Sequence, residues 1–419
     1  MINKYDSNHE SSDREAKTFC EFFAGIGLVR AGLEPSGWRC VYANDVDSKK
    51  KELYENRFGC DDRFHLGDVW NTSEVLDRIV DRPFLATASF PCVDLSPAGH
   101  RRGFEGEHSS TFFGFVKILA ALGERRPKLV LLENVTGFLT SKNGADFKAA
   151  IRSLSELGYA IDAFTLDAKY FVPQSRPRVF VVGIDRDLEA PGAIRANSTD
   201  WFGDGFDRAI DRADASIRPR RILPLLRSID PPPELIAFHI PKPIATIPPL
   251  VDLIDLDLDQ KWWDEAQVQK HYLMMNDKHC AIVDRMIAAG ESFVGTIFRR
   301  KRGGSTRAEV RFDGLAGCLR TPRGGSARQI VIAIDRGVLR MRWMSPREYA
   351  RLQGVGDYPL VENEVQNLFG FGDAVCTPVI RHIDRYILTP VFDHRSNSIE
   401  PGLAGGESDQ RPEDPIILA

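Results

Sequence analysis

Between Thr18 and Asp185 the sequence alternates short apolar runs with segments that have helical spacing. The apolar runs are TFCEFFA, CVYAND, PFLATASFP, KLVLLENV, YAIDAFTL and RVFVVGI, and helical segments cover 47–58, 111–125 and 146–157. Strands separated by helices of about 10–15 residues are typical of βαβ units, in which consecutive strands run parallel. The alternation therefore predicts an α/β fold with a doubly wound, mainly parallel, Rossmann-like sheet.

The pattern changes after Asp185. Residues 186–340 have poor periodicity and many prolines. They contain one helical stretch at 262–290, and short β-like runs between 295 and 342 that glycine pairs interrupt. We therefore predict that 186–340 forms a second, smaller domain with irregular or β-rich content.

Helical spacing returns at Met344, so residues 341–390 are predicted to rejoin the 18–185 domain. Residues 1–17 are polar and lack periodicity, which predicts a disordered leader. Residues 391–419 are rich in Gly, Pro, Ser and acidic residues, which predicts a disordered tail.

Composition limits the functions that such a chain can serve. Hydrophobic residues make up 43% and charged residues 27% of the 419, which is ordinary for a soluble globular protein. The net charge of −4 excludes a protein coated in positive charge but permits nucleic-acid binding by one local basic face. No apolar run approaches the roughly 18 residues of a membrane span, and the polar N-terminus is unlike a signal peptide. Seven scattered cysteines without a CxxC pair indicate a reducing cytoplasm and no metal site.

Two glycines, Gly25 and Gly27, follow the first predicted strand within FFAGIGL at 22–28. Glycines at a strand-to-helix turn let a ligand approach the backbone closely. Asp45 ends the second strand, where an acid can accept hydrogen bonds from both hydroxyls of a ribose. The sequence has no third glycine at the dinucleotide spacing, so S-adenosylmethionine fits better than NAD. The alternative interpretation is a tight turn and a surface aspartate.

Two reactive side chains end the following strands. Cys92 closes the segment ASFPC at the end of the run PFLATASFP, and Glu133 follows the apolar run KLVLL. The carboxyl ends of parallel strands line the crevice where such folds bind ligands. There a thiolate can serve as a nucleophile and a carboxyl group can exchange a proton. Alternatively, Cys92 is a buried small apolar residue and Glu133 a carboxylate at a helix start.

The segment QSRPR at 174–178 directly precedes the strand RVFVVGI. Arg176 and Arg178 are two residues apart, so on an extended segment their side chains point the same way. Together they could hold a carbonyl oxygen and a phosphate, although ordinary surface charge is the alternative. We expect all four segments to lie at the carboxyl ends of strands, on one edge of the sheet.

Taken in order, these segments resemble the DNA (cytosine-5) methyltransferases of bacterial restriction-modification systems. FAGIGL is similar to the family's cofactor loop, FPC to its catalytic loop, ENV to its catalytic glutamate motif, and QSRPR to its QxRxR motif. MSPRE and ARLQG within 344–354, and FGDAV at 371–375, are similar to its last two motifs. The resemblance covers roughly 18–185 and 340–388, and 186–340 lies where that family places its target recognition domain.

The resemblance implies methyl transfer from S-adenosylmethionine to C5 of a cytosine flipped out of duplex DNA, through a covalent bond between Cys92 and C6. It implies that Glu133 contacts N3 and the exocyclic amine, that Arg178 holds O2, and that Arg176 supports the loop or a phosphate. The cofactor residues that it implies are Phe22, Phe23, Gly25, Gly27, Leu28, Asp45, Val46, Asp68, Val69, Pro91, Phe112, Asp373 and Ala374.

Two positions depart from the family's pattern. Asp373 stands where the family usually has an asparagine that helps close the cofactor pocket. Val46 stands where an aromatic residue often stacks on the adenine, and either Phe23 or Phe112 could supply that surface instead.

A basic stripe between Arg299 and Arg351 contains fourteen Lys or Arg residues and four acidic ones. Such a stripe is the footprint expected for phosphate contact. Within it we predict phosphate contacts from 299–302 and a base contact from Arg323 or Arg328, with a solvated loop that touches only phosphates as the alternative. The predicted DNA-contact residues are Ser96, Arg101, Gln174, Arg299, Arg300, Arg302, Arg320, Arg323, Arg328 and Gln329.

The partner that these features imply is double-stranded DNA. A cognate restriction endonuclease is expected to act on the same site. The protein itself is expected to be a monomer in the cytoplasm. Two alternatives remain open. One is a tRNA cytosine-5 methyltransferase on the same scaffold, although the size of 186–340 favours DNA. The other is an inactive DNA-binding relative, against which the presence of Cys92, Glu133 and Arg178 argues.

Overall fold

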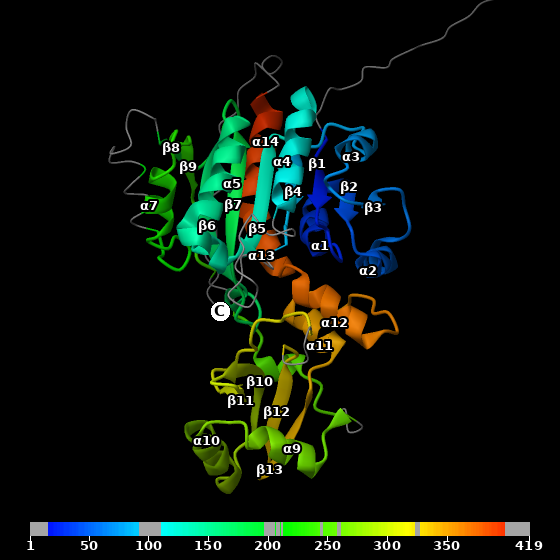
Figure 1. The fold of residues 1–419 in the computed structure, drawn as a ribbon, viewed down its shortest axis with the longest axis vertical. Coiled ribbons are helices and arrows are strands. Elements are labelled where there is room, and N and C mark those ends of the chain that lie inside the picture. Colours follow the sequence, from blue (N-terminus) through cyan, green and yellow to red (C-terminus); the bar gives the residue numbers. More distant parts are fainter. Residues whose placement is uncertain are drawn as a thin grey trace, which may run out of the picture.

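The computed structural model describes residues 16–91, 110–196, 206, 210, 213–243, 246–257, 261–322 and 327–398. These residues build a nine-stranded sheet in the order β3-β2-β1-β4-β5-β7-β6-β9-β8 and a separate four-stranded sheet (Figure 1). The strands of the large sheet are β1 Thr18–Phe22, β2 Arg39–Asp45, β3 Phe64–Leu66, β4 Leu85–Ala88, β5 Leu129–Val135, β6 Tyr159–Asp167, β7 Pro177–Asp185, β8 Ala193–Ala196 and β9 Leu235–Phe238.

The first five strands of the large sheet run parallel, so their carboxyl ends share one edge. Strand β7 runs antiparallel between β5 and β6, with Arg178 opposite Val135. The QSRPR segment therefore reaches the common edge from the amino end of its strand. Our expectation that it would lie at a carboxyl end was wrong, because the reversed strand was not evident from an apolar run.

Helices cover both faces of the large sheet, because alternate residues of each buried strand point to opposite sides. Phe19 of β1 belongs to a hydrophobic cluster with α1, α2 and α11 to α14, whereas Cys20 and Phe22 pack with α3, α4, α5 and α7 (Figure 1). The helices are α1 Leu28–Leu33, α2 Ser48–Phe58, α3 Thr72–Arg78, α4 Thr111–Ala121, α5 Ala145–Glu156, α7 Ile222–Arg227, α8 Leu250–Leu253, α11 Pro346–Leu352, α12 Glu364–Asp373, α13 Thr377–Ile383 and α14 Thr389–Ser398. The predicted doubly wound, mainly parallel sheet is confirmed.

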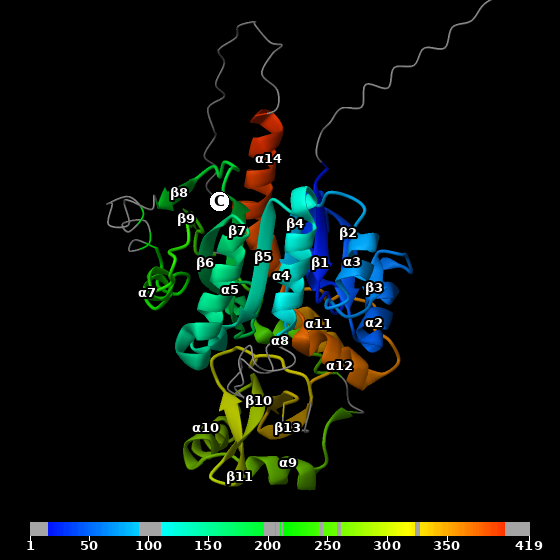
Figure 2. The same cartoon turned by 45° about the horizontal axis from the view of Figure 1, so that its top comes forward.

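The second sheet is antiparallel, in the order β11-β10-β12-β13, and has a hydrophobic cluster of its own that includes Val283, Ile297 and Met341. In both views α11 and α12 lie between the two sheets (Figure 2). Its strands are β10 Phe293–Arg302, β11 Ser305–Arg311, β12 Ile330–Asp335 and β13 Val338–Trp343, and its helices are α9 Glu265–Tyr272 and α10 Asp277–Ala288.

The helical stretch predicted at 262–290 is two helices. The Asn276 side chain accepts the backbone N–H of His279 and caps α10, so the chain turns there instead of continuing as one helix.

The domain boundary predicted at 186 is wrong. Strands β8 and β9 pair with each other, and β9 pairs with β6, so the chain up to Phe238 extends the large sheet. The antiparallel sheet and its helices come later, from α9 onward. Proline-rich sequence marked irregular connections here, but it did not reveal which sheet the short strands join.

The boundaries predicted at both termini also shift. Helix α14 continues to Ser398, and Val391 is fully buried, so the predicted tail does not begin at 391. Lys17 is anchored, because its Nζ donates to the Ser36 carbonyl at 2.7 Å and to Thr389 Oγ1 at 2.8 Å. Residues 1–15 and 399–419 lie outside the described residues. Within the described part, no helix is long and apolar enough to cross a membrane.

Candidate active site

The turn between β1 and α1 depends on glycine. Phe23, Gly25 and Gly27 have φ angles of 56°, 57° and 76°, in the left-handed region that side chains disfavour. A Cβ on Gly27 would lie 2.5 Å from the Phe58 ring and 2.7 Å from the Tyr54 ring, whereas one on Gly25 would meet only Lys50 Cδ at 3.9 Å. Gly27 is thus required for both its backbone angle and its lack of volume.

Gly27→Ala is expected to lower the free energy of unfolding by roughly 2–4 kcal/mol, because it combines backbone strain with overpacking. Gly25→Ala is the matched control and should cost only about 1–2 kcal/mol, since it adds the strain without the clash. Urea unfolding of both variants measures the difference. Equal losses would show that the rings of Tyr54 and Phe58 yield without cost.

Asp45 is buried at the carboxyl end of β2, beside this turn. Its Oδ2 accepts the N–H of Gly25 at 2.9 Å, and its Oδ1 accepts the N–H of Asp47 at 3.0 Å. Each carboxylate oxygen can accept a further hydrogen bond, so the fixed side chain retains capacity for two ribose hydroxyls. Val46 follows with its side chain 67% exposed, which leaves an apolar surface next to this carboxylate.

Asp68 lies after β3 and is exposed, with Oδ1 accepting the N–H of Trp70 at 3.0 Å. The two strand ends are tied together, because the Asn44 amide donates to the carbonyls of His65 and Gly67 at 3.2 and 2.7 Å. Asp45 and Asp68 are therefore carried by two adjacent parallel strands that end together, as the cofactor prediction requires.

Several predicted cofactor residues cannot offer their side chains to a ligand. Phe22, Leu28, Val69 and Phe112 are at most 2% exposed and belong to the two cores. The idea that Phe112 supplies an aromatic surface is wrong, because it packs against Phe90, Phe113 and Phe115. Phe23, Pro91 and Ala374 remain half-buried, and Asp373 is exposed.

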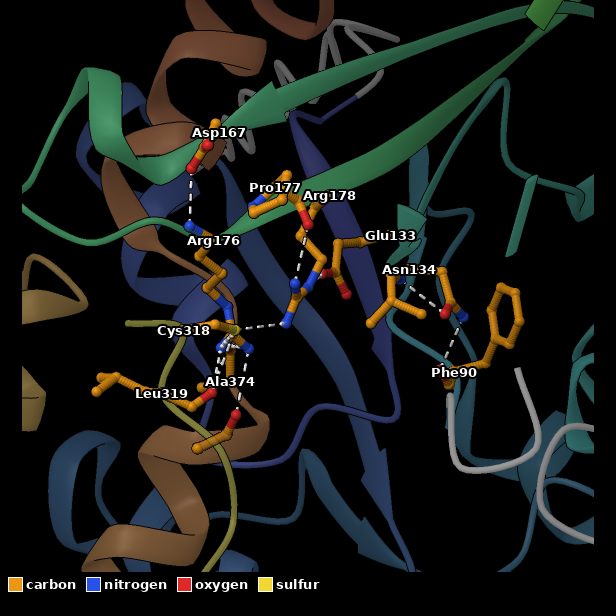
Figure 3. A network of polar contacts seen from close by, with 12 residues as sticks. Phe90, Glu133, Asn134, Asp167, Arg176, Pro177, Arg178, Cys318, Leu319 and Ala374 are labelled. Carbon is orange, nitrogen blue, oxygen red and sulfur yellow. Dashed lines mark hydrogen bonds and ion pairs between the residues drawn. The ribbon is translucent and has the colours of Figure 1, made fainter. Parts of the chain in front are cut away.

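Glu133 and Arg178 form the polar centre at the same edge (Figure 3). Arg178 Nε lies 2.9 Å from Glu133 Oε1, and both side chains are largely buried. The Asn134 amide donates to the carbonyl of Phe90 at 3.1 Å, which ties β5 to the segment leading to residue 92. Cys92 itself lies outside the described residues. Glu133 and Arg178, far apart in the sequence, are brought together as predicted.

Arg176 supports loops and is too buried to reach a phosphate, because only 3% of it is exposed. Its guanidinium donates to the carbonyls of Leu319, Gly372 and Ala374 at 2.8, 3.2 and 2.6 Å (Figure 3). Burial and the nearby charge of Arg178 lower the pKa of Arg176. Of the two roles predicted for it, the structure therefore supports the loop contact.

Cys318 was not singled out from the sequence, yet it lies between the two arginines (Figure 3). Its Sγ is 3.5 Å from Arg176 Nη1 and 3.9 Å from Arg178 Nη2. Burial alone would raise the pKa of the Cys318 thiol, but the charges of Arg176, Arg178 and Arg320 outweigh burial and lower it. No local pattern marks this cysteine, because the two arginines come from a segment about 140 residues earlier in the chain.

Two predicted DNA contacts are wrong because their side chains are buried. Gln174 is fully buried; its amide donates to the Leu352 carbonyl at 2.7 Å and its Oε1 accepts the Leu319 N–H at 3.2 Å. Gln329 is only 2% exposed, in the core beneath Gly317. Gln174 thereby ties its segment to α11 and to Leu319, and neither glutamine side chain reaches the surface.

The predicted basic contacts divide into three groups. Arg328 is held by Glu364, by the Met344 carbonyl at 3.1 Å and by the Trp343 ring, so it is not poised to read a base. Arg299 stacks on the Trp343 ring at 4.7 Å and Arg300 pairs with Glu309 at 2.7 Å, while Arg320 is exposed. Ser96, Arg101, Arg323 and the side chain of Arg302 lie outside the described residues.

Comparisons with known proteins identify the family to which the sequence is similar. Residues 17–389 match the family model described as C-5 cytosine-specific DNA methylase. The type II methyltransferase M.HpaII of Haemophilus parainfluenzae is 26% identical over 395 residues, 90% of each chain. M.BsuFI of Bacillus subtilis and M.HhaI of Haemophilus parahaemolyticus are 37% and 35% identical over 44% and 41% of this chain. Those two matches span only about half of each relative, 44% and 50% of its length.

Solved structures share the fold. The methyltransferase EhMeth of Entamoeba histolytica matches with a TM-score of 0.59 and 13% identity, over 90% of this chain and 98% of that chain. The Dnmt2 methyltransferase of S. pombe matches with a TM-score of 0.55 and 16% identity, over 89% and 99%. At these identities the likeness concerns the fold alone. The family model, which spans most of the sequence, establishes that the chain belongs to the C-5 cytosine-specific DNA methylase family.

Proposed function

We propose that the protein transfers a methyl group from S-adenosylmethionine to C5 of cytosine in a specific duplex DNA sequence. The observation that carries this proposal is the juxtaposition of the Glu133–Arg178 pair with a glycine turn and Asp45 at one sheet edge, in a chain of the C-5 methylase family. The fit to the cofactor rests on Asp45, whose fixed carboxylate can accept two further hydrogen bonds beside a turn that a ligand can approach closely.

The chemistry assigns a separate role to each residue. The C5 of cytosine is a weak nucleophile, so the Cys92 thiolate first bonds to C6 and makes C5 electron-rich. Glu133 contacts N3 and the exocyclic amine and stabilises the charge that develops on the ring, while Arg178 holds O2. S-adenosylmethionine supplies the methyl group. The C5 proton then leaves to a water, the Cys92–C6 bond breaks, and the thiolate is restored.

The base must leave the duplex, at a cost of a few kcal/mol, because C5 and C6 cannot be reached within the stack. The segment that follows Cys92 contains Ser96 and Arg101, and its glycine and basic residues suit a loop that covers the flipped base and its phosphates. This assignment rests on the sequence, because these residues lie outside the described ones.

Labelled methyl transfer to duplex DNA and to tRNA tests the proposed substrate. We expect incorporation into duplex DNA only, and transfer confined to tRNA would favour the RNA-modifying alternative. Bisulfite sequencing of DNA from a host that expresses the gene then identifies the methylated sequence. We also propose that a restriction endonuclease cuts the same DNA site. The methyltransferase itself is proposed to be a monomer that acts in the cytoplasm.

Arg320→Ala is expected to weaken binding to cognate and random duplexes equally and to reduce the salt slope by about 1, because an exposed arginine beside the site contacts phosphate. Arg323→Ala should instead cost ~1–3 kcal/mol on the cognate duplex and little on random DNA. Arg328→Ala is the matched control. Its guanidinium is held by Glu364, so it should change unfolding more than DNA affinity. Binding across a salt series measures all three, and a cognate-specific loss for Arg320→Ala would contradict the phosphate assignment.

A further inference from the structure

The segment that carries Cys318 connects β11 to β12 and lies along the QSRPR segment. Backbone hydrogen bonds hold the two segments together. The Ser175 N–H donates to the Ala316 carbonyl at 3.0 Å, and the Ala316 N–H donates to the Pro173 carbonyl at 2.7 Å. Cys318 is therefore placed beside the two arginines by the backbone, two residues beyond this bridge.

The Cys318 sulfur lies between two guanidinium groups (Figure 3). Arg176 Nη1 donates to Sγ at 3.5 Å, and Arg178 Nη2 donates to Sγ at 3.9 Å. Arg176 is the fixed partner, because it is 97% buried and its other hydrogen bonds go to three backbone carbonyls. The sulfur thus connects an immobile arginine to the arginine that the proposed mechanism uses.

Three contacts, one on each nitrogen, determine the plane of the Arg178 guanidinium. Its Nε lies 2.9 Å from Glu133 Oε1, its Nη1 donates to the Pro177 carbonyl at 2.9 Å, and its Nη2 donates to Cys318. A guanidinium is planar and its five N–H groups point in fixed directions. Contacts on all three nitrogens therefore also determine where its remaining donors point.

The charges around Cys318 strengthen its sulfur as an acceptor. Burial would raise the pKa of the thiol, but the charges of Arg176, Arg178 and Arg320 outweigh burial and lower it. A lower pKa favours the thiolate, which accepts hydrogen bonds more strongly than a neutral thiol. Negative charge on the sulfur also offsets part of the cost of burying the Arg176 guanidinium.

We propose that Cys318 is a positioning residue for the arginine that contacts the base: its sulfur holds Nη2 of Arg178 and, together with Glu133, orients the guanidinium toward O2 of the flipped cytosine. This inference rests on the proposed function, which supplies the contact between Arg178 and O2. Cys318 touches neither the methyl donor nor the reacting carbon in this assignment. Its removal therefore affects the rate of transfer through Arg178 and has little effect on binding.

Single-turnover methyl transfer by the full-length protein tests the inference, with a duplex that contains the methylated sequence and with separate titrations of duplex and S-adenosylmethionine. Cys318→Ala should lower the rate constant about 10–100-fold and change each affinity less than about twofold, because a misplaced guanidinium acts mainly on the transition state. Cys318→Ser keeps an acceptor and should restore the rate to within about fivefold of wild type. Cys318→Val fills the volume without an acceptor and should repeat the loss, so it replaces the alanine variant if that variant does not fold.

An Arg178→Lys background separates positioning of Arg178 from general support of the loop. Lysine keeps the positive charge but has no planar fork for Cys318 to orient. In this background Cys318→Ala should lower the rate by less than a further factor of about two. If Cys318 acted by supporting the loop through Arg176, the whole 10–100-fold loss would recur in the Arg178→Lys protein and contradict the inference.

Cys280→Ala is the matched control. Cys280 is also a half-buried free cysteine, but it lies on α10, where its Sγ contacts the Tyr272 carbonyl at 3.8 Å. Its loss should leave the transfer rate and both affinities unchanged. Thermal unfolding of each variant shows whether the fold is retained.

A wild-type rate in Cys318→Ala, or a serine variant as slow as the valine variant, would overturn the inference while leaving the proposed function intact. A wild-type protein that transfers no methyl group to duplex DNA would instead overturn the proposed function, and the inference with it. The wild-type transfer measurement therefore separates the two failures.

Discussion

Cys92→Ser is expected to reduce methyl transfer to duplex DNA by roughly 10³-fold or more while leaving the affinity for S-adenosylmethionine within about twofold. A thiol is partly ionised at neutral pH, whereas a serine hydroxyl needs a base to become a nucleophile. The proposed cofactor contacts are carried by other segments, namely the glycine turn, Asp45 and Asp68. Labelled methyl transfer and titration calorimetry measure the two quantities separately.

A duplex that contains 5-fluorocytosine provides the decisive form of this experiment. Fluorine at C5 prevents the final elimination, so wild-type protein should remain bonded to the DNA on a denaturing gel. Cys60→Ser is the control, because Cys60 is an exposed cysteine outside the proposed site, and it should still form the adduct. An adduct formed by Cys92→Ser would show that another side chain is the nucleophile.

Glu133→Gln is expected to lower the single-turnover rate by roughly 10²–10⁴-fold with little change in duplex affinity. The amide keeps the size of the side chain and can still accept a hydrogen bond from Arg178, which now contacts Glu133 Oε1 at 2.9 Å. It cannot share a proton with N3 or carry the charge that stabilises the reacting ring. Single-turnover kinetics and duplex binding under the same conditions measure the expected difference.

Glu124→Gln removes an exposed carboxylate that lies before β5 and should leave both quantities unchanged. Wild-type turnover by Glu133→Gln would mean that Glu133 serves only to hold Arg178. A large loss of duplex binding by the same variant would place its role in recognition instead of chemistry.

The order of charged and apolar residues explains why part of the site could be predicted. Gly27 and Asp45 lie directly after buried strands, and parallel strands bring their carboxyl ends to one edge, so local signals were sufficient to predict a cofactor site there. Glu133 was found for the same reason. Arg178 also lies at this edge beside Glu133, although the reversed direction of β7 that delivers it there was not predicted.

Two predicted DNA contacts failed because they were chosen from the basic composition of the 299–351 stretch and not from the direction in which each side chain points. Gln329 has a side chain suited to reading adenine, but it lies in the core, and Arg328 is held by Glu364. Whether a polar side chain in a basic stretch faces solvent or the interior depends on strand register, which glycine-interrupted β-like runs do not specify.

The sequence by itself determined six strands and three helices of the 18–185 region, the glycine turn and the family, because apolar periodicity, glycine and short motifs act over a few residues. It did not mark the short strand β3 or the helix α3. Only the tertiary structure decided that β8 and β9 join the large sheet, that Arg176 holds three backbone carbonyls, and that Lys50 pairs with Asp373. These contacts join residues tens to hundreds of positions apart. Their geometry depends on how whole elements pack, and no local pattern of residues encodes it.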